Sequence, residues 1–128
     1  MKRTSAKQPR KQRKARFTAH GHYRRRYISS HLSDALIKEY NVRSMPVRKG
    51  DVVRVLRGAE EHRGKECVVT DVYPKELKIG LEGVNIRKAD GSEVAKKVDP
   101  SNVIIVKFDL SDPKRRDKLE NLKTGGFV

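Results

Sequence analysis

Hydrophobic and polar residues alternate in short runs through the middle of the chain, between residues 47 and 110. Alternation with a period of two is typical of β-strands that bury one face. We predict strands over residues 51–56, 66–73, 76–81, 84–88, 93–98 and 102–108. An Asp90-Gly91 pair separates the fourth run from the fifth, and such a pair between extended segments is a strong hairpin signal. Short strands joined by tight turns predict a small β-barrel with a hairpin extension.

A short helix is predicted before the barrel. Ser33 is a suitable N-cap, and Asp34 suits the positive N-terminal end of a helix. An apolar side is supplied by Ala35, Leu36, Ile37 and Tyr40, and Asn41 is a plausible stop signal.

A second helix is predicted after the barrel. It is expected to begin at Ser111 or Asp112, with Pro113 in its first turn, and to end at Gly125. Three apolar residues are expected to pack this helix against the rest of the protein, namely Leu110, Leu119 and Leu122.

Residues 1–27 show no hydrophobic periodicity, and we expect Pro9 to break any early helix there. The segment is therefore predicted to be an arm without regular structure. Phe17, Tyr23 and Tyr27 are interleaved with arginines. Aromatic rings among cations can stack on RNA bases while arginine contacts phosphate. The same three rings could instead fix the arm to its own domain, and the sequence favours neither alternative.

These patterns divide the chain into three regions. The arm and the short helix occupy residues 1–46, the barrel with its hairpin extension occupies residues 47–110, and the C-terminal helix and tail occupy residues 111–128. The predicted fold class is mostly β, and 128 residues suffice for one domain with an extension.

Positive charge is concentrated in the first region. The chain has 31 Lys and Arg against 16 Asp and Glu, a net charge of +15. Residues 1–46 carry +11 of it, and no carboxylate precedes Asp34. A localised cationic segment is typical of a docking element for a polyanion, and the commonest polyanion in a cell is nucleic acid. A nuclear-import signal or a solvated tail is the alternative interpretation.

Several classes of protein are not indicated. No apolar run approaches the ~18 residues of a membrane span, and the N-terminus lacks the apolar stretch of a secretory signal. The single Cys67 leaves no intrachain disulfide. The acidic residues are scattered, and the one cluster, residues 60–62, lies in a predicted loop. We therefore predict an intracellular binding protein without catalytic site, metal, cofactor, membrane contact or small-molecule substrate.

A loop bracketed by Gly58 and Gly64 joins the first two predicted strands. We expect the cations near it to lie together at one end of the barrel, where glycine lets the backbone approach a phosphate. They are Arg48, Lys49, Arg57, Arg63 and Lys65.

The run from Val47 to Tyr73 resembles a KOW motif, which occurs in ribosomal proteins and in NusG-type transcription elongation factors. It includes Arg48-Lys49-Gly50-Asp51, Arg57-Gly58 and Arg63-Gly64-Lys65. Two features depart from the motif. The loop between the bracketing glycines is long and acidic, and Cys67 stands where the motif usually has a second glycine.

The segments that flank the motif resemble one family in particular. Residues 29–33, 40–51, 87–91 and 99–103 are similar to the universal KOW-motif protein of the large ribosomal subunit, the twenty-fourth in bacterial naming and the twenty-sixth in eukaryotic naming. The arm and the chain length look archaeal. A NusG-like elongation factor, the alternative, would need a separate α/β domain before the barrel, and residues 1–46 are too short and too basic for one.

This resemblance implies an SH3-like barrel and a structural role in the large subunit. It implies direct binding to the 5′ domain of large-subunit rRNA, early in subunit assembly, near the polypeptide tunnel exit. The implied partners are this rRNA and neighbouring ribosomal proteins, without homo-oligomerisation, in cytoplasmic ribosomes. The expected rRNA contacts, from the charge pattern and the resemblance together, are Lys7, Arg10, Lys11, Arg13, Lys14, Arg16, Arg24, Arg25, Arg26, Arg43, Arg48, Lys49, Arg57, Arg63, Gly64, Lys65, Arg87 and Lys88.

Overall fold

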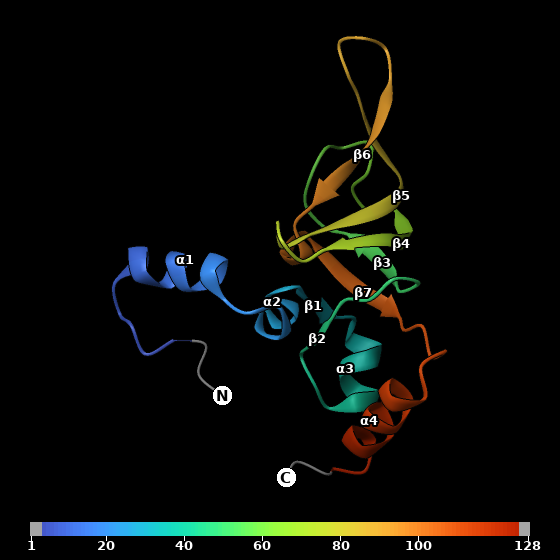
Figure 1. The fold of residues 1–128 in the computed structure, drawn as a ribbon. Coiled ribbons are helices and arrows are strands. Elements are labelled where there is room, and N and C mark those ends of the chain that lie inside the picture. The colour runs from blue at the N-terminus through green and yellow to red at the C-terminus, as the bar shows by residue number, and fades with distance from the viewer. Residues whose placement is uncertain (1–3, 126–128) are drawn as a thin grey trace.

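A computed structural model describes residues 4–125; the first and last three residues of the predicted arm and tail lie outside the described residues. Within this range the chain forms a β-sheet with two helices before it and two helices packed together at one end (Figure 1). The elements are α1 (Pro9–Thr18), α2 (Gly21–Tyr27), β1 (Ser29–Leu32), α3 (Asp34–Tyr40), β2 (Ser44–Pro46), β3 (Val52–Val55), β4 (Glu66–Tyr73), β5 (Lys78–Arg87), β6 (Glu93–Val98), the 3-10 helix η1 (Pro100–Asn102), β7 (Val103–Lys107) and α4 (Pro113–Lys123).

The strands form one seven-stranded sheet in the order β2-β1-β7-β3-β4-β5-β6 over the described residues. Neighbouring strands are antiparallel except β1 and β7, which pair in parallel. The sheet curves without closing, and β2 and β6 are its edges. The prediction of a mostly β, barrel-like fold with a short helix on the N-terminal side and a helix at the C-terminal end is confirmed.

The alternation that predicted the strands is the alternation that builds the core. In β3, Val53 and Val55 are buried while Arg54 between them is exposed. Val53 pairs with Ile105 of β7 on one side and with Cys67 of β4 on the other. The buried residues of the sheet form one continuous apolar layer with the two packed helices, which includes Val69, Ile79, Leu81, Val103, Ile105, Tyr40, Phe108 and Leu119.

Two predicted strands, residues 76–81 and 84–88, are one longer strand, β5. Glu82-Gly83 has the composition of a turn, but here it lies in an irregular stretch between Gly80 and Asn85 that bends the strand without ending its pairing with β6. The second half of β5 and β6 therefore extend beyond the sheet as a hairpin (Figure 1).

The arm is helical, and the prediction that it lacks regular structure is wrong for residues 9–27. Pro9 begins α1 instead of breaking it. At the first helical position the missing N–H of proline costs no hydrogen bond, and its fixed φ suits a helix. A short loop, residues 19–20, then joins α1 to α2.

Two strands had no signal in the pattern. β1 and β2 contain serines and a histidine, and the partner of β1 across the sheet lies far away in sequence. His31 and Leu32 pair with Ile104 and Ile105 of β7. The buried Ser30 hydroxyl donates a hydrogen bond of 2.6 Å to the carbonyl oxygen of Pro100.

The boundaries of the two packed helices, α3 and α4, lie close to the predicted ones. α3 begins after Ser33 and ends at Asn41, whose φ of +56° is the left-handed conformation common at helix ends. α4 begins after Asp112, whose carboxylate accepts a hydrogen bond from the backbone N–H of Lys114. Leu119 is buried and Leu122 packs against the core, but Leu110, predicted to pack, is 41% exposed.

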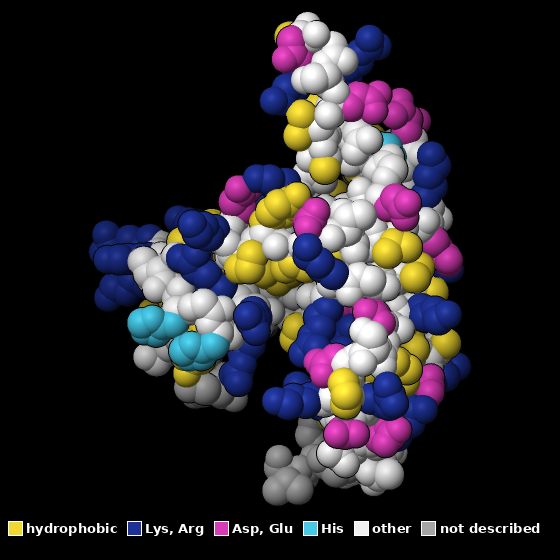
Figure 2. Space-filling model, turned by 45° about the vertical axis from the view of Figure 1, so that its right-hand side comes forward, with side chains coloured by type: hydrophobic (Ala, Val, Ile, Leu, Met, Phe, Trp, Pro, Cys, Tyr) yellow, Lys and Arg dark blue, Asp and Glu magenta, His cyan; other side chains and the backbone are white. Residues whose placement is uncertain are grey.

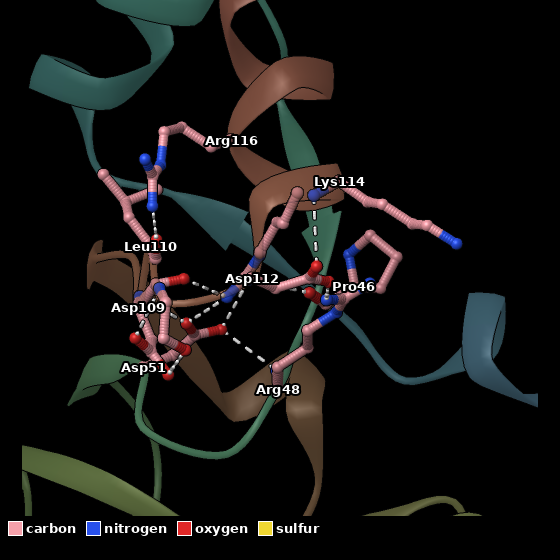
Figure 3. Close-up of polar contacts among 10 residues, drawn as sticks. Pro46, Arg48, Asp51, Asp109, Leu110, Asp112, Lys114 and Arg116 are labelled. Atoms are coloured by element: carbon pink, nitrogen blue, oxygen red, sulfur yellow. Dashed lines mark hydrogen bonds and ion pairs between the residues drawn. The ribbon is translucent and has the colours of Figure 1, made fainter.

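A buried ion pair connects the start of the sheet to α4. The two carboxylate oxygens of Asp51 accept hydrogen bonds of 2.6 and 2.7 Å from the guanidinium of Arg115. Their side chains are 0% and 3% exposed. The same carboxylate accepts bonds from the backbone N–H groups of Arg48, at 3.0 Å, and Asp109, at 2.9 Å (Figure 3).

The rest of the Arg115 guanidinium is also in contact with the protein. It donates to the carbonyl oxygens of Asp109 and Pro46 and lies 5.0 Å from the ring centre of Phe108. One side chain of α4 thus joins the segment before β3, the segment after β7 and the apolar core.

Removing one partner of this pair is predicted to be costly. Arg115→Ala should lower the free energy of unfolding by about 3–5 kcal/mol, because it leaves the Asp51 carboxylate buried without its counter-charge. Urea unfolding measures the difference. Arg116→Ala removes an exposed neighbour on the same helix and should cost less than about 1 kcal/mol. Equal losses in the two variants would contradict the structural role of the pair.

The turn before Asp51 allows a second test. Gly50 has a φ of +88°, and a Cβ there would lie 2.7 Å from Oδ2 of Asp109. Gly91, in the hairpin turn, has a φ of +89° and no heavy atom within 4 Å of an added Cβ. Gly91→Ala should therefore cost only the conformational penalty, about 1–2 kcal/mol. Gly50→Ala should cost clearly more in the same urea experiment, and a smaller loss than at Gly91 would contradict the close approach to Asp109.

Candidate nucleic-acid interface

The arm presents cations around most of α1. Arg10, Lys11, Arg13 and Lys14 are exposed, Arg16 is half-buried, and α1 buries none of its residues completely. Figure 1 shows α1 projecting beside the sheet, and Figure 2 shows Lys and Arg gathered at the end of this projection. Because residues 1–33 contain no Asp or Glu, the arm cannot neutralise its own charge.

α2 connects α1 to the sheet. The Arg24 guanidinium donates to the carbonyl oxygens of Ala19, at 2.9 Å, and Phe17, at 2.6 Å, so it ties the end of α1 to α2. Ile28, just after α2, is buried in the core, and Tyr27 packs against it. Arg25 is exposed.

The two alternatives for the aromatic rings apply to different residues. Tyr27 packs against the core and fixes the arm to the protein. Phe17 is 56% exposed, with the Arg16 guanidinium 5.9 Å from its ring centre. Tyr23 is half-buried, and the Arg26 guanidinium lies 5.7 Å from its ring centre.

Arg48 and Lys49, before β3, are held by carboxylates. Arg48 forms an ion pair with Asp112, and its hydrogen bond lowers the pKa of that carboxyl below its usual range. Lys49 lies 2.7 Å from an oxygen of Asp71, whose hydrogen bond raises the pKa of the ammonium group. Both cations are more than half exposed, so these pairs can exchange for a phosphate.

The cations of the loop after β3 are separate from that pair. Arg57, Arg63, Gly64 and Lys65 are all exposed. Gly64, with a φ of +80°, donates its N–H to the carbonyl oxygen of Val55. Since this loop follows β3 and the Arg48-Lys49 turn precedes it, the two groups lie at opposite ends of that strand. The prediction that all five cations share one end of the barrel is wrong.

The remaining predicted contacts lie elsewhere. Arg43 is exposed just before β2. Arg87 ends β5, and Lys88 follows in the turn of the projecting hairpin. The structure therefore distributes the predicted contacts over the arm, both ends of β3 and the hairpin.

A cleft of about 620 Å³ lies between α1 and the β1–β2 edge of the sheet. One wall is a face of α1, and the other combines Tyr27 with strand and 3-10-helix residues that no sequence pattern had grouped. Those overlooked residues are Ser29, His31, Ser44, Asp99 and Ser101.

Asp99 is an ionised group in this cleft. Burial raises the pKa of its carboxyl, but hydrogen bonds from Lys78 and from Ser101 outweigh that effect, so the pKa lies below its usual value. Lys78 Nζ is 3.0 Å from Oδ2 of Asp99. The group is therefore an acceptor at neutral pH.

The family that comprises the L26 ribosomal proteins of eukaryotes and their L24-type counterparts in archaea matches residues 6–122, which include most of the arm, the whole sheet and nearly all of α4. The chain belongs to this family.

Archaeal relatives match it over almost their full length. The large ribosomal subunit protein uL24 of Methanoculleus marisnigri is 49% identical over 119 residues, 93% of this chain and 97% of the relative. The same protein of Methanospirillum hungatei is 46% identical over 93% of this chain and 98% of the relative. The uL24 protein of Saccharolobus solfataricus is 42% identical over 90% of this chain and 95% of the relative.

Family membership confirms several predictions. The chain is an archaeal-like ribosomal protein that acts in the ribosome, and the family is structural, not enzymatic. No helix in the described part of the chain is long and apolar enough to cross a membrane.

The buried Asp51–Arg115 pair was not predicted from the sequence either. A signal exists, because Arg115, Leu119 and Leu122 share one face of α4 at the spacing i, i+4 and i+7. An arginine on the apolar face of a helix is expected to be buried, and a buried arginine needs an anion as its partner. Asp51, directly before a hydrophobic strand, is a candidate for that partner.

Proposed function

We propose that the protein is a structural constituent of the large ribosomal subunit that binds the 5′ domain of large-subunit rRNA directly. The observation that carries the proposal is the helical arm, which is cationic on most sides and contains no acidic residue. Binding to rRNA early in subunit assembly and a position near the polypeptide tunnel exit belong to the same proposal. They rest on the family resemblance.

Shape and phosphate contact dominate this mode of binding. The arm projects beside the sheet (Figure 1), so its cations can meet phosphates that the sheet itself does not reach. Arginine and lysine that neutralise phosphates release counterions, and this release makes the affinity strongly dependent on salt. Such contacts position a protein on RNA without reading its sequence.

The sheet contributes a second set of contacts in this proposal. Arg57, Arg63 and Lys65 extend from an exposed loop whose glycines allow close backbone approach. Arg48 and Lys49 contribute at the other end of β3 by exchanging their carboxylate partners for phosphates. The protein thereby contacts RNA at both ends of β3, with neighbouring ribosomal proteins as its other partners.

Removing α1 should weaken rRNA binding without unfolding the protein. Deletion of residues 1–19 removes eight Lys and Arg but keeps Tyr27 and Ile28 in the core. The affinity for a transcript of the 5′ domain of Methanoculleus marisnigri large-subunit rRNA should fall. The slope of log affinity against log salt should become shallower by about 0.7–0.9 for each phosphate that the shortened protein no longer neutralises. Filter binding over a salt series measures both quantities.

A control for this deletion neutralises cations of α4. Lys114→Gln with Lys118→Gln also lowers the net charge, but on a helix far from the arm (Figure 1). This variant should leave the salt slope nearly unchanged. The same slope for the deletion and the full chain would contradict arm binding, and equal affinity for transcripts of other rRNA domains would contradict the 5′-domain assignment.

A further inference from the structure

The cleft between α1 and the sheet has one cationic wall. Pro9, Gln12, Arg13 and Arg16 line it at the spacing i, i+3, i+4 and i+7, so they share one face of α1. This face would be expected to pack on the sheet if it were apolar. It carries two guanidinium groups instead, and the space beside it stays open at about 620 Å³.

The opposite wall offers hydrogen bonds and flat rings. Ser29 and His31 are two residues apart on β1 and therefore lie on the same face of the sheet. Ser44 of β2 pairs directly with His31. Tyr27 lines the cleft beside them, and Ser101 adds a hydroxyl from η1.

Arg16 has a buried side-chain donor that no described residue of the protein satisfies. Its Nε atom is buried and meets no hydrogen-bond acceptor among the described residues. A buried donor normally has a partner, because a donor removed from water without one is destabilised. Arg16 also lines the cleft, so a ligand there that carries acceptor oxygens would supply this partner once the guanidinium turns toward it.

The two walls together select a type of ligand. It must present an anion toward α1, and hydroxyl groups or a flat ring toward Ser29, His31 and Tyr27. Asp99, ionised at the η1 end of the cleft, repels a second anion there and accepts a hydrogen bond from an N–H or O–H group. A nucleotide strand has this polarity, with phosphate on one side and ribose and base on the other.

We propose that an unpaired strand of RNA passes through this cleft. Its phosphates contact Arg13 and Arg16, and its ribose hydroxyls or base edges contact Ser29, Ser44 and Asp99. A base stacks on Tyr27 or His31. A duplex keeps its base faces stacked inside the helix, whereas an unpaired base can lie on an aromatic ring. This inference rests on the proposed rRNA binding. It adds that the protein contacts the riboses and bases of one short unpaired RNA segment as well as its phosphates.

Two matched pairs of variants of the full-length protein test the cleft. Arg13→Gln removes a cation that lines the cleft, whereas Lys14→Gln removes an exposed cation from a different side of the same helix. Arg13→Gln should weaken binding to the 5′-domain transcript about tenfold, and Lys14→Gln less than about threefold. His31→Ala should weaken binding about fivefold or more because stacking is removed, whereas His22→Ala, outside the cleft, should have little effect.

Acylation of ribose 2′-hydroxyls on the same transcript locates the strand. The wild-type protein should protect a short run of nucleotides that are unpaired in the free RNA. Arg13→Gln and His31→Ala should lose protection at that run alone and keep the rest of the footprint.

The possible results separate this inference from the proposed function. Equal losses of affinity within each matched pair, with an unchanged footprint, would overturn the cleft assignment and leave rRNA binding intact. Loss of protection at base-paired nucleotides would overturn the unpaired strand. A wild-type protein that does not bind the transcript would overturn the proposed function itself.

Discussion

The ion pair between Asp51 and Arg115 is the constraint on which the arrangement of the protein depends. Buried in a small core, the two charges are tolerated because each has several partners: two backbone N–H groups for the carboxylate, two carbonyl oxygens and the Phe108 ring for the guanidinium. The free energy lost by removing such a pair from water can equal the free energy gained from its attraction. The pair therefore fixes the geometry of the fold more than it adds to its stability. It sets where α4 meets the sheet.

The position of α4 then determines what the remaining surface can do. α4 packs beside α3, where Tyr40 and Phe108 meet edge to face with ring centres 5.6 Å apart. This helix pair closes one end of the sheet (Figure 1). Asp112, just before α4, also forms an ion pair with Arg48, so a second contact besides the Asp51–Arg115 pair fixes the turn before β3 to the start of α4. The parts left to project are α1, the β3–β4 loop and the tip of the β5–β6 hairpin, none of which buries a residue in the core.

Residues with local signals were predicted well, and those whose partners lie far away in sequence were not. Alternation in β3 and the ends of α3 and α4 depend on neighbours within a few positions. The structure has the alternation, the Asp112 cap and the Asn41 stop as predicted, whereas Ser33 precedes α3 without a side-chain capping hydrogen bond. β1 owes its existence to β7, some 70 residues away, so the polar Ser29-Ser30-His31 gave no sign of it. The cleft likewise combines α1 with Asp99 and Ser101, which lie more than 80 positions further along the chain.

The candidate site followed the same division. Charge is visible in a sequence, and so the cations of the arm and the β3–β4 loop could be named in advance. Their grouping could not, because Arg48 and Arg63 are close in sequence but lie at opposite ends of β3. Pro9 gave the wrong answer for a local reason, since the same residue breaks the interior of a helix and begins one at its first turn.

The central claim is that this chain is a firmly bound component of the large ribosomal subunit, held by rRNA. Sucrose-gradient fractionation of native lysate, with the chain detected at low and at high salt, tests it most directly. We predict that the chain sediments with the large subunit at both salt concentrations, since exposed arm cations and several separate sheet contacts act together. Release into light fractions, or sedimentation with RNA polymerase, would contradict it.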